Sequence, residues 1–376
     1  MAQQAPQLTS SSPSSTLYIG LMSGTSMDGV DGILVDLGNA LPRVLKHTHL
    51  PFQDSLKQDL IQLNDSGKTE HELEKAALTA NTLSQLYAQC VEQLTDDPSS
   101  IKAIGCHGQT IRHRPEKGFT VQLVNGALLA ELTGINTICD FRSRDIAAGG
   151  QGAPLVPIVH QAWFSDKNKH RIILNLGGIA NLTSLHPHQS VLGFDCGPAN
   201  LLLDGWIYRS TGKSFDSAGA WARGGQINTQ LLNRLLKHPF LSLPPPKSTG
   251  RESFNISWLL NIEGVNQIKA QDVQATLTEF SALCIIESVT VLKSDLPLEI
   301  VCGGGGALNL FLLERIANHL QDIPIITTEK LGMDIHQVEA AAFAWLAYAF
   351  DQGLAGNVTS VTGAKHPAIL GALYPA

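Results

Sequence analysis

Three glycine-rich turns, each placed after a short apolar segment, constrain this chain more than any other feature. They span residues 20–29, 177–181 and 303–306. Glycine lets the backbone come close to a ligand and lets successive N–H groups converge on a phosphate. One such turn is more often an ordinary hairpin. Three of them at predicted strand ends favour a nucleotide held between two parts of the chain.

Apolar segments and helical periodicity alternate along the chain in two similar series. The first begins with strands predicted at residues 17–22 and 30–35 and continues with a helix over residues 70–94. The second begins with a strand over residues 171–176 and continues with a helix over residues 200–208. Alternating strands and helices predict an α/β fold with two halves, each built on a sheet.

Length, charge and cysteine usage narrow the class of protein. The 376 residues are enough for two domains with separate cores. A net charge of −7 argues against a nucleic-acid partner, because no basic field would offset phosphate repulsion. The six cysteines form no C-x-x-C pair, so neither a zinc site nor a disulfide framework is predicted. This usage is typical of a reducing compartment.

The sequence has no pattern that would direct the chain to a membrane. Residues 1–15 are polar and lack a signal-peptide pattern, so we expect a disordered leader there. The longest apolar segment, residues 338–350, contains Glu339 and is too short to span a bilayer. We therefore expect a soluble, cytoplasmic protein with no membrane partner.

Standard nucleotide and hydrolase signatures are absent from the candidate turns. Gly212-Lys213-Ser214 has Ile207 where a Walker A motif needs glycine. The dinucleotide fingerprint beginning at Gly303 has Leu308 where its third glycine belongs. No nucleophile elbow surrounds the serines of the first turn. A P-loop NTPase, an NAD enzyme and a serine hydrolase are therefore disfavoured.

Several polar residues have a possible chemical role and a structural alternative. Asp28 and Asp31 could hold Mg²⁺ beside the first turn, or could simply form the turn and the strand end. Asp195 follows a predicted strand, where α/β folds place reactive groups, but it could equally cap the next helix. His107 and Gln109 could line a pocket or satisfy backbone groups.

Three further segments leave alternatives open. The charged residues 140–145 could bind an anion through arginine or form a solvated ion-pair network. Glu339 lies in an apolar predicted helix, so it either faces a polar cleft or has a partner. Residues 244–251 must form an extended loop, because three consecutive prolines fit no regular element. That loop is expected near the cleft, at an exposed turn or at a subunit contact.

Taken together and in this order, the motifs resemble the anhydro-N-acetylmuramic acid kinases, a branch of the sugar kinase, heat-shock chaperone and actin superfamily. The resemblance extends from about Thr16 to the C-terminus. The matching segments are residues 20–31, 106–110, 140–145, 175–181, 193–198, 246–252, 303–307 and 338–347.

The resemblance implies a fold and a reaction. Two actin-like, ribonuclease-H-like α/β domains would close on a central nucleotide cleft. Residues 16–140 plus 337–376 would form the first domain, and residues 141–336 the second. The reaction would use ATP and Mg²⁺. Water would open the 1,6-anhydro ring of the cell-wall sugar while O6 receives the γ-phosphoryl group, giving N-acetylmuramic acid 6-phosphate in peptidoglycan recycling.

Two other function classes stay open from the residues themselves. One is a superfamily kinase for a different sugar or a carboxylate, and the other is a non-enzymatic ATP-gated binding protein. The implied partner is a small-molecule sugar, and a homodimer is a further family expectation.

The resemblance also assigns roles to residues. Asp195 matches the general base, and Arg144 and Glu339 match sugar-binding positions, where we also expect Gln109. Asp28 and Asp31 would hold Mg²⁺. The predicted nucleotide-binding residues are Gly24, Thr25, Ser26, Met27, Asp28, Gly29, Val30, Asp31, Gly177, Gly178, Asn181, Gly303, Gly304 and Gly305.

Two positions beside Asp195 depart from the family pattern. Cys196 stands where threonine is usual, and Ala199 where glycine is usual. A thiol is a weaker hydrogen-bond partner than a hydroxyl, so the orientation of Asp195 by this neighbour is in question.

Overall fold

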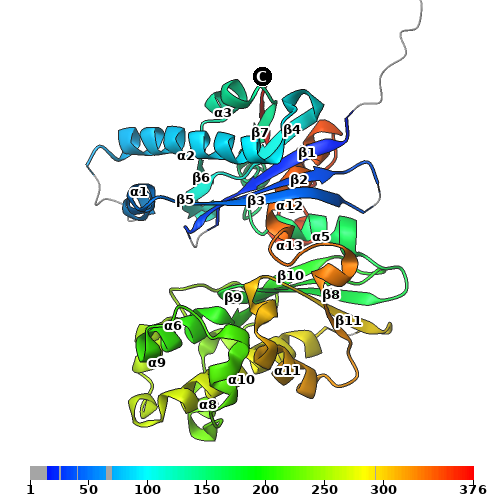
Figure 1. Ribbon diagram of the computed structural model, residues 1–376. Helices are drawn as coiled ribbons and strands as arrows, with labels where there is room; N and C mark the ends of the chain where they lie inside the picture. Colours follow the sequence, from blue (N-terminus) through cyan, green and yellow to red (C-terminus); the bar gives the residue numbers. More distant parts are fainter. Residues whose placement is uncertain (1–14, 25–26, 40, 65–69, 293) are drawn as a thin grey trace, which may run out of the picture.

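The computed structural model describes residues 15–24, 27–39, 41–64, 70–292 and 294–376. The expected leader therefore lies outside the described residues, apart from Ser15. Two sheets dominate the molecule, each accompanied by helices (Figure 1). The α/β fold predicted from the sequence is confirmed.

The first sheet has six strands in the order β13-β7-β4-β1-β2-β3. Its strands are β1 (Leu17–Met22), β2 (Gly29–Asp36), β3 (Arg43–Pro51), β4 (Ile101–Cys106), β7 (Thr137–Cys139) and β13 (Ala372–Tyr374). The second sheet has five strands in the order β10-β9-β8-β11-β12. Its strands are β8 (His170–Leu176), β9 (Ile179–Leu185), β10 (Leu192–Pro198), β11 (Leu298–Gly303) and β12 (Ile325–Thr327). A separate hairpin joins β5 (Gln109–Arg114) to β6 (Phe119–Leu123).

The two sheets share one topology. In each half the first three strands form an antiparallel meander, β1-β2-β3 in the first and β8-β9-β10 in the second. The fourth strand of each half then pairs in parallel with the first, and the fifth pairs in parallel with the fourth. β13 extends the first sheet at the far side of β7. The chain thus uses the same strand arrangement twice.

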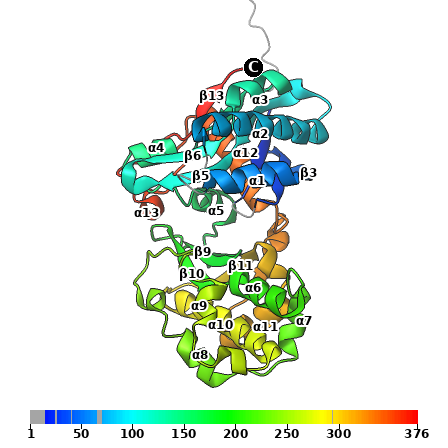
Figure 2. The same ribbon diagram turned by 90° about the vertical axis from the view of Figure 1, so that its left-hand side faces the viewer.

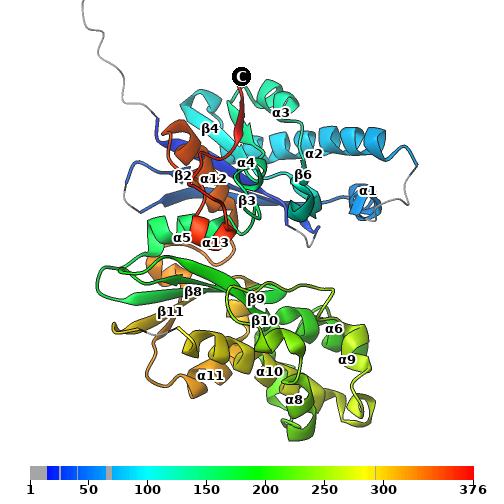
Figure 3. The same cartoon turned by 180° about the vertical axis from the view of Figure 1, so that it is seen from behind.

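Helices cover both sheets and fill the space between them, as three views of the ribbon show (Figures 1, 2 and 3). α2 and α3 lie on the outer side of the first sheet, α5 and α12 lie between the sheets, and α6, α10 and α11 lie beyond the second. The helices are α1 (Asp54–Asn64), α2 (Glu72–Leu94), α3 (Gly126–Thr133), α4 (Ser143–Ala147), α5 (Val156–Phe164), α6 (Asn200–Thr211), α7 (Ala220–Arg223), α8 (Thr229–Leu235), α9 (Ile256–Leu260), α10 (Ala270–Thr290), α11 (Leu310–His319), α12 (Val338–Asp351) and α13 (Thr359–Thr362).

One hydrophobic cluster runs through the middle layer. It joins Tyr18 of the first sheet to Val159 of α5, Phe343 of α12 and Ile173 of the second sheet. Apolar side chains on both faces of these central helices explain why residues 338–350 show little helical alternation, as expected for a buried helix. In the part of the chain that the structure describes, no helix is long and apolar enough to cross a membrane.

The approach of α12 to the first sheet depends on glycine. A Cβ atom on Gly20 would lie 1.9 Å from the carbonyl oxygen of Ala340, and one on Gly105 would lie 2.0 Å from that of Phe343. Gly20 lies inside β1, so the first glycine turn begins after Met22 rather than at residue 20 as the sequence suggested. Close packing of the helix, and not ligand contact, accounts for glycine at position 20.

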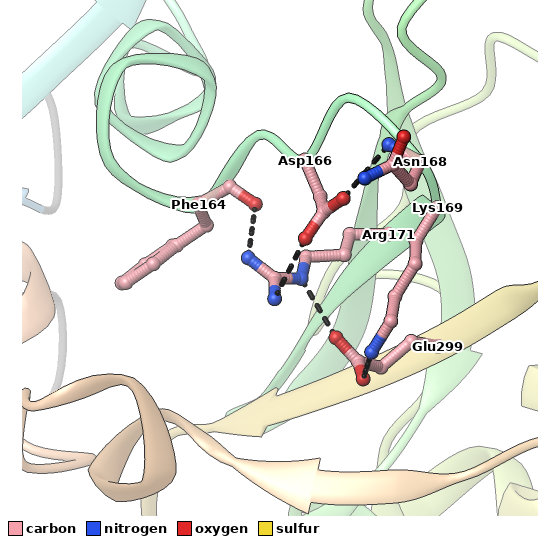
Figure 4. Close-up of polar contacts among 6 residues, drawn as sticks. All are labelled: Phe164, Asp166, Asn168, Lys169, Arg171 and Glu299. Carbon is pink, nitrogen blue, oxygen red and sulfur yellow. Dashed lines mark hydrogen bonds and ion pairs between the residues drawn. The ribbon is translucent and has the colours of Figure 1, made fainter.

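The chain crosses from the first half to the second between α5 and β8. An ion-pair network fixes this crossover (Figure 4). Glu299 of β11 pairs with Lys169 at 2.5 Å and with Arg171 at 2.7 Å. Arg171 also lies 3.3 Å from Asp166 and donates to the carbonyl oxygen of Phe164 at 3.1 Å. The end of α5 is therefore tied to two strands of the second sheet.

Candidate active site

The β1–β2 turn is supported from below by buried polar side chains. The hydroxyl of Ser23 lies 2.7 Å from that of Tyr87 and donates to the carbonyl oxygen of Gly108 at 3.2 Å. Gln109 is fully buried and its Nε2 donates to the carbonyl oxygen of Gly24 at 3.1 Å. Gln109, predicted as a substrate contact, thus holds the backbone of the turn. Its Oε1 atom has no partner among the described residues.

The remainder of this turn leads into β2. Thr25 and Ser26, predicted to bind nucleotide, lie outside the described residues. Met27 has a positive φ of 55°, and its N–H donates back to the carbonyl oxygen of Gly24 at 3.2 Å. Gly29 and Val30 are the first residues of β2. A side chain on Gly29 would clash with the carbonyl oxygen of Leu50 at 2.3 Å, so strand packing requires glycine there.

The two aspartates of this segment have different surroundings. Asp28 is exposed just before β2. Asp31 lies within β2, with its Oδ1 atom 2.9 Å from Nδ1 of His49 and 3.6 Å from Nε2 of His47. Burial alone would raise the pKa of Asp31, but the two histidines outweigh it and hold the pKa below its ordinary value.

No group of three or more His, Cys, Asp or Glu side chains that could hold a metal ion occurs among the described residues. Mg²⁺ in kinases is held by one or two carboxylates together with waters and substrate phosphates. The exposed carboxylate of Asp28 fits such a role. Asp31 fits it less directly, because His49 already contacts one of its oxygens.

The charge of Arg142 acts on Glu339 at the start of α12, an interaction that the sequence analysis missed. Its side chain keeps access to solvent. The protein packed around it and the nearby charge of Asp31 raise the pKa of Glu339, while Arg142 opposes this shift. Arg142 in turn donates from Nε and Nη2 to His107 and from Nη1 to the carbonyl oxygen of Gly152. Glu339 is therefore an exposed carboxylate that interacts with Arg142 through charge.

The charged segment 140–145 divides into separate roles. Arg142 contacts His107, whereas Arg144, predicted as a sugar contact, is exposed on α4. Asp145 is fully buried. Its carboxylate accepts hydrogen bonds from Asn357 at 2.6 Å, Thr362 at 2.7 Å and the N–H of Gly152 at 2.7 Å. Asp145 thus joins α4 to the C-terminal segment.

Asp195 lies within β10 in the second half and not after the end of the strand as the sequence suggested, because the strand continues to Pro198. Its Oδ2 atom accepts hydrogen bonds from the hydroxyl of Ser248 at 3.0 Å and from the N–H of Thr249 at 2.9 Å. Burial raises the pKa of Asp195 above its ordinary value; these two hydrogen bonds oppose the shift, and the charge of Glu252 adds to it. The capping alternative is wrong, because Ala199 occupies the N-cap of α6 and no side chain caps that helix.

The two departures from the family pattern leave Asp195 in place. The pairing of β10 with β9 is irregular between Asp195 and Gly197, and Cys196 is buried in the hydrophobic cluster of the second half. Ala199 has a φ of −113°, so it lies outside the left-handed region that favours glycine. The orientation of Asp195 therefore comes from Ser248 and Thr249 and not from its neighbour in the strand.

Glycines at two strand ends of the second half have no structural reason to be glycine. A Cβ atom would meet nothing closer than 3.5 Å at Gly177, 3.7 Å at Gly178, 3.5 Å at Gly303 and 3.9 Å at Gly305. None of these four has a positive φ. Packing and backbone conformation therefore do not require glycine at these positions. A backbone without side chains is suited to the close approach of a ligand.

Two neighbouring glycines differ from these four. Gly304 has a φ of +76°, and a Cβ on it would lie 2.4 Å from Oδ1 of Asn175. A Cβ on Gly306 would lie 2.7 Å from the carbonyl oxygen of Leu176. These two positions therefore bring the end of β11 against the end of β8. Asn181, also predicted to bind nucleotide, lies within β9 opposite Asn175.

The twice-used sheet topology defines an α/β protein of two similar halves, with bare glycine backbone at strand ends of the second half. A profile of the anhydro-N-acetylmuramic acid kinase family matches residues 16–376. The chain belongs to the anhydro-N-acetylmuramic acid kinase family.

Relatives and solved structures resemble the chain to different degrees. It is 48% identical to the anhydro-N-acetylmuramic acid kinase of Ralstonia nicotianae, covering 98% of this chain and 100% of the relative. It is also 48% identical to the anhydro-N-acetylmuramic acid kinase of Nitrosomonas europaea, and the match covers 96% of this chain and 99% of that relative. Among solved structures, a 2-hydroxyisocaproyl-CoA dehydratase activator from Clostridium difficile has 13% identity and a TM-score of 0.44, covering 89% of this chain and 95% of the activator. A ROK family glucokinase from Streptomyces griseus has 13% identity and a TM-score of 0.40, and the match covers 88% of this chain and 99% of the glucokinase.

Proposed function

We propose that this protein is an ATP-dependent kinase that opens 1,6-anhydro-N-acetylmuramic acid with water and phosphorylates O6, giving N-acetylmuramic acid 6-phosphate and ADP in peptidoglycan recycling. Family membership across residues 16–376 carries this proposal. The expected setting is the cytoplasm, where ATP is available. The domain boundaries at residues 16–140 plus 337–376 and 141–336, and a homodimer, remain predictions.

Asp195 is the proposed general base. It takes a proton from a water molecule whose oxygen forms a bond to C1 of the sugar. The C1–O6 bond breaks, and O6 uses the released electron pair to attack the γ-phosphorus, with ADP leaving. A ring oxygen has no proton to lose, so bond cleavage is what makes O6 nucleophilic. The raised pKa of Asp195 suits this role, because a more basic carboxylate accepts a proton more readily.

The sugar and the nucleotide have proposed contacts in both halves. Arg142 and Glu339 supply opposite charges for polar sugar groups, together with the predicted contacts Arg144 and Gln109. The turn after β1 and the glycines at 177–178 and 303–305 would bind the nucleotide, with bare backbone open to it. Mg²⁺ would neutralise phosphate charge, held by Asp28 through water and by Asp31 less directly.

ADP release in a coupled assay tests this function. We expect ADP to form only when 1,6-anhydro-N-acetylmuramic acid is supplied, and the product to gain the mass of one water and one phosphoryl group. Sugars with a free 6-hydroxyl serve as matched alternatives. Turnover with such a sugar but not with the anhydro sugar would assign the chain to a different superfamily kinase. ATP binding without any phosphorylated product would mark a binding protein.

A further inference from the structure

A loop segment lies along the outer edge of the second sheet, directly beside Asp195. β10 is the edge strand of that sheet. The N–H of Asp195 donates to the carbonyl oxygen of Lys247 at 2.9 Å, and the next two residues return two hydrogen bonds to the Asp195 side chain. The sequence analysis left several locations open for residues 247–249. In the structure these residues are hydrogen-bonded to Asp195, the candidate base.

Both returning hydrogen bonds reach the same carboxylate oxygen. The hydroxyl of Ser248 and the N–H of Thr249 each donate to Oδ2 of Asp195. Two donors on one oxygen fix the rotation of the carboxylate and leave Oδ1 as the oxygen that can accept a further proton. Hydrogen bonds of this kind, made by residues that do not react themselves, commonly set the geometry of a reacting group.

The core of the second half anchors this segment. The ammonium group of Lys247 donates to the carbonyl oxygen of Leu241 at 3.0 Å and lies 4.7 Å from the ring centroid of Phe240. Phe240 and Leu241 are buried in the same hydrophobic cluster as α10. The position of Ser248 is therefore set by the protein itself, before any substrate binds.

The Thr249 side chain supplies a second observation. Its Oγ1 atom is buried and has no hydrogen-bond partner among the described residues. A buried hydroxyl left without a partner costs about 1 to 3 kcal/mol. Such a group is expected to meet a polar atom of a ligand or a bound water, and its own N–H already places Thr249 against Asp195.

We propose that Ser248 is a positioning residue that turns Oδ1 of Asp195 toward the attacking water, and that the Thr249 hydroxyl hydrogen-bonds to that same water. This inference rests on the proposed function, because it takes Asp195 to be the base. In the step itself, the water proton passes to Oδ1, the water oxygen bonds to C1, and the C1–O6 bond breaks. Ser248 and the Thr249 N–H stabilise the carboxylate through Oδ2 until the proton arrives.

Replacing Ser248 tests the positioning role. Ser248→Ala should lower kcat about 10- to 100-fold, the size of effect that a misplaced reacting group produces, with little change in the KM for ATP. Ser248→Thr keeps the hydroxyl and should restore most of the loss. If Ser248→Ala does not fold, Ser248→Cys gives a side chain of similar shape with a weaker donor and should show an intermediate loss.

The pH profile separates positioning from a structural role. The Ser248 hydroxyl favours the ionised form of Asp195, so its removal should raise the pKa of Asp195 further. Because the base must be ionised, the acidic limb of kcat/KM should then move to higher pH. Ser242→Ala is the matched control, since Ser242 is exposed and donates only to Pro239 in its own turn. Ser248→Ala with normal kcat and an unmoved acidic limb would overturn the proposal.

Thr249→Val and Thr249→Ser test the water contact. Valine keeps the shape without the hydroxyl, so kcat should fall while the melting temperature is unchanged or raised, because an unpaired buried polar group is removed. Serine should retain activity. Normal turnover by Thr249→Val would overturn the water contact. If Asp195→Asn keeps near-normal turnover, the proposed base fails and this inference fails with it; if Asp195→Asn is inactive and Ser248→Ala is normal, only this inference fails.

Discussion

Arg142 donates from both Nε and Nη2 to the Nε2 atom of His107, at 3.0 and 2.9 Å. Burial keeps the pKa of His107 well below its ordinary value, with the charge of Arg142 adding to the shift, so the imidazole accepts these bonds as a neutral ring. Burial also lowers the pKa of Arg142, to about 10, so the guanidinium stays charged near neutral pH. The arginine is thus oriented by a neutral partner and its positive charge remains available to Glu339.

Replacing Arg142 should weaken sugar binding. Arg142→Gln removes the cation that opposes the raised pKa of Glu339, so a larger share of Glu339 is protonated at mildly acidic pH. We expect kcat/KM for the sugar to fall about 10- to 100-fold, the cost of losing hydrogen bonds to a charged group, with a greater loss at lower pH. Steady-state kinetics across pH, compared with the exposed Arg144→Gln, measures this. A larger loss for Arg144→Gln would place the sugar at α4 instead.

Asp195→Asn should abolish turnover of the anhydro sugar. Removal of a general base lowers kcat by about 10²- to 10⁴-fold, whereas ATP binding should survive because the nucleotide contacts lie elsewhere. Coupled ADP release and thermal shift with ATP·Mg²⁺ measure the two effects. The matched control is Asp204→Asn in α6, a carboxyl whose pKa is also raised, to about 6, by burial and Asp216. Equal losses in both variants would argue against a specific role for Asp195.

Substitutions of glycines in the second half should show which of them serve nucleotide binding and which serve stability. Gly178→Ala and Gly305→Ala add a methyl group into open space, so the melting temperature should hold while the KM for ATP rises. Gly304→Ala is the contrasting variant, because its positive φ and its contact with Asn175 should cost about 1 to 3 kcal/mol of stability. An unchanged KM for ATP in both Gly178→Ala and Gly305→Ala would remove these positions from the nucleotide site.

Glu299 should stabilise the fold in a pH-dependent way. Burial alone would raise the pKa of Glu299, but Lys169 and Arg171 hold this pKa below its ordinary value. A carboxyl with a lowered pKa contributes its full stability above the unfolded-state value and loses it as pH falls through the folded-state value. Glu299→Gln should therefore lower the free energy of unfolding by about 1.5 to 3 kcal/mol near neutral pH, and the difference from wild type should shrink in acid.

Urea unfolding near neutral pH and in acid measures this difference. Glu263→Gln is the control, because the side chain of Glu263 is 91% exposed and lies 3.8 Å from Arg234, and an exposed pair of this kind contributes little. A difference between wild type and Glu299→Gln that grows in acid would contradict the assignment.

The two halves should draw together when substrates bind. Asp195 belongs to the second half and Glu339 to a helix on the first sheet, so the proposed site would contact one sugar from both sides. Closure would also exclude bulk water from a phosphoryl transfer. Small-angle scattering should show a smaller radius of gyration for Asp195→Asn with ATP·Mg²⁺ and the anhydro sugar than without them. NAD in place of ATP should leave the radius unchanged.

Local sequence patterns were sufficient to predict the alternating elements and the positions where strands end. The strand before residue 177 and the helix that begins at Asn200 follow from apolar runs bounded by glycine or proline, whereas β10 continues past Asp195 to Pro198. These features depend on neighbours in the sequence, which is why the α/β fold and the candidate site could be approached without coordinates.

Other features depended on contacts between distant segments. Whether Arg142 or Arg144 faces Glu339 is decided by how α4 sits against α12, which no local pattern records. The contact of Ser248 with Asp195 joins positions 53 residues apart. Gly20 looked like part of a ligand turn, but its small size serves a helix more than 300 residues later. Charge and glycine content in the sequence identified candidate residues. The role of each residue became apparent only from its contacts in the folded structure.

Because α12 and β13 complete the first sheet from the far end of the chain, the order of synthesis and the order of folding should differ. The strands of the second sheet all lie within residues 170–327, so the ribosome releases that half as one continuous stretch. The other strands of the first sheet are made earlier, yet the face that carries Gly20 and Gly105 stays uncovered until residues 338–351 emerge. The half of the protein that is translated first is therefore the last to finish folding.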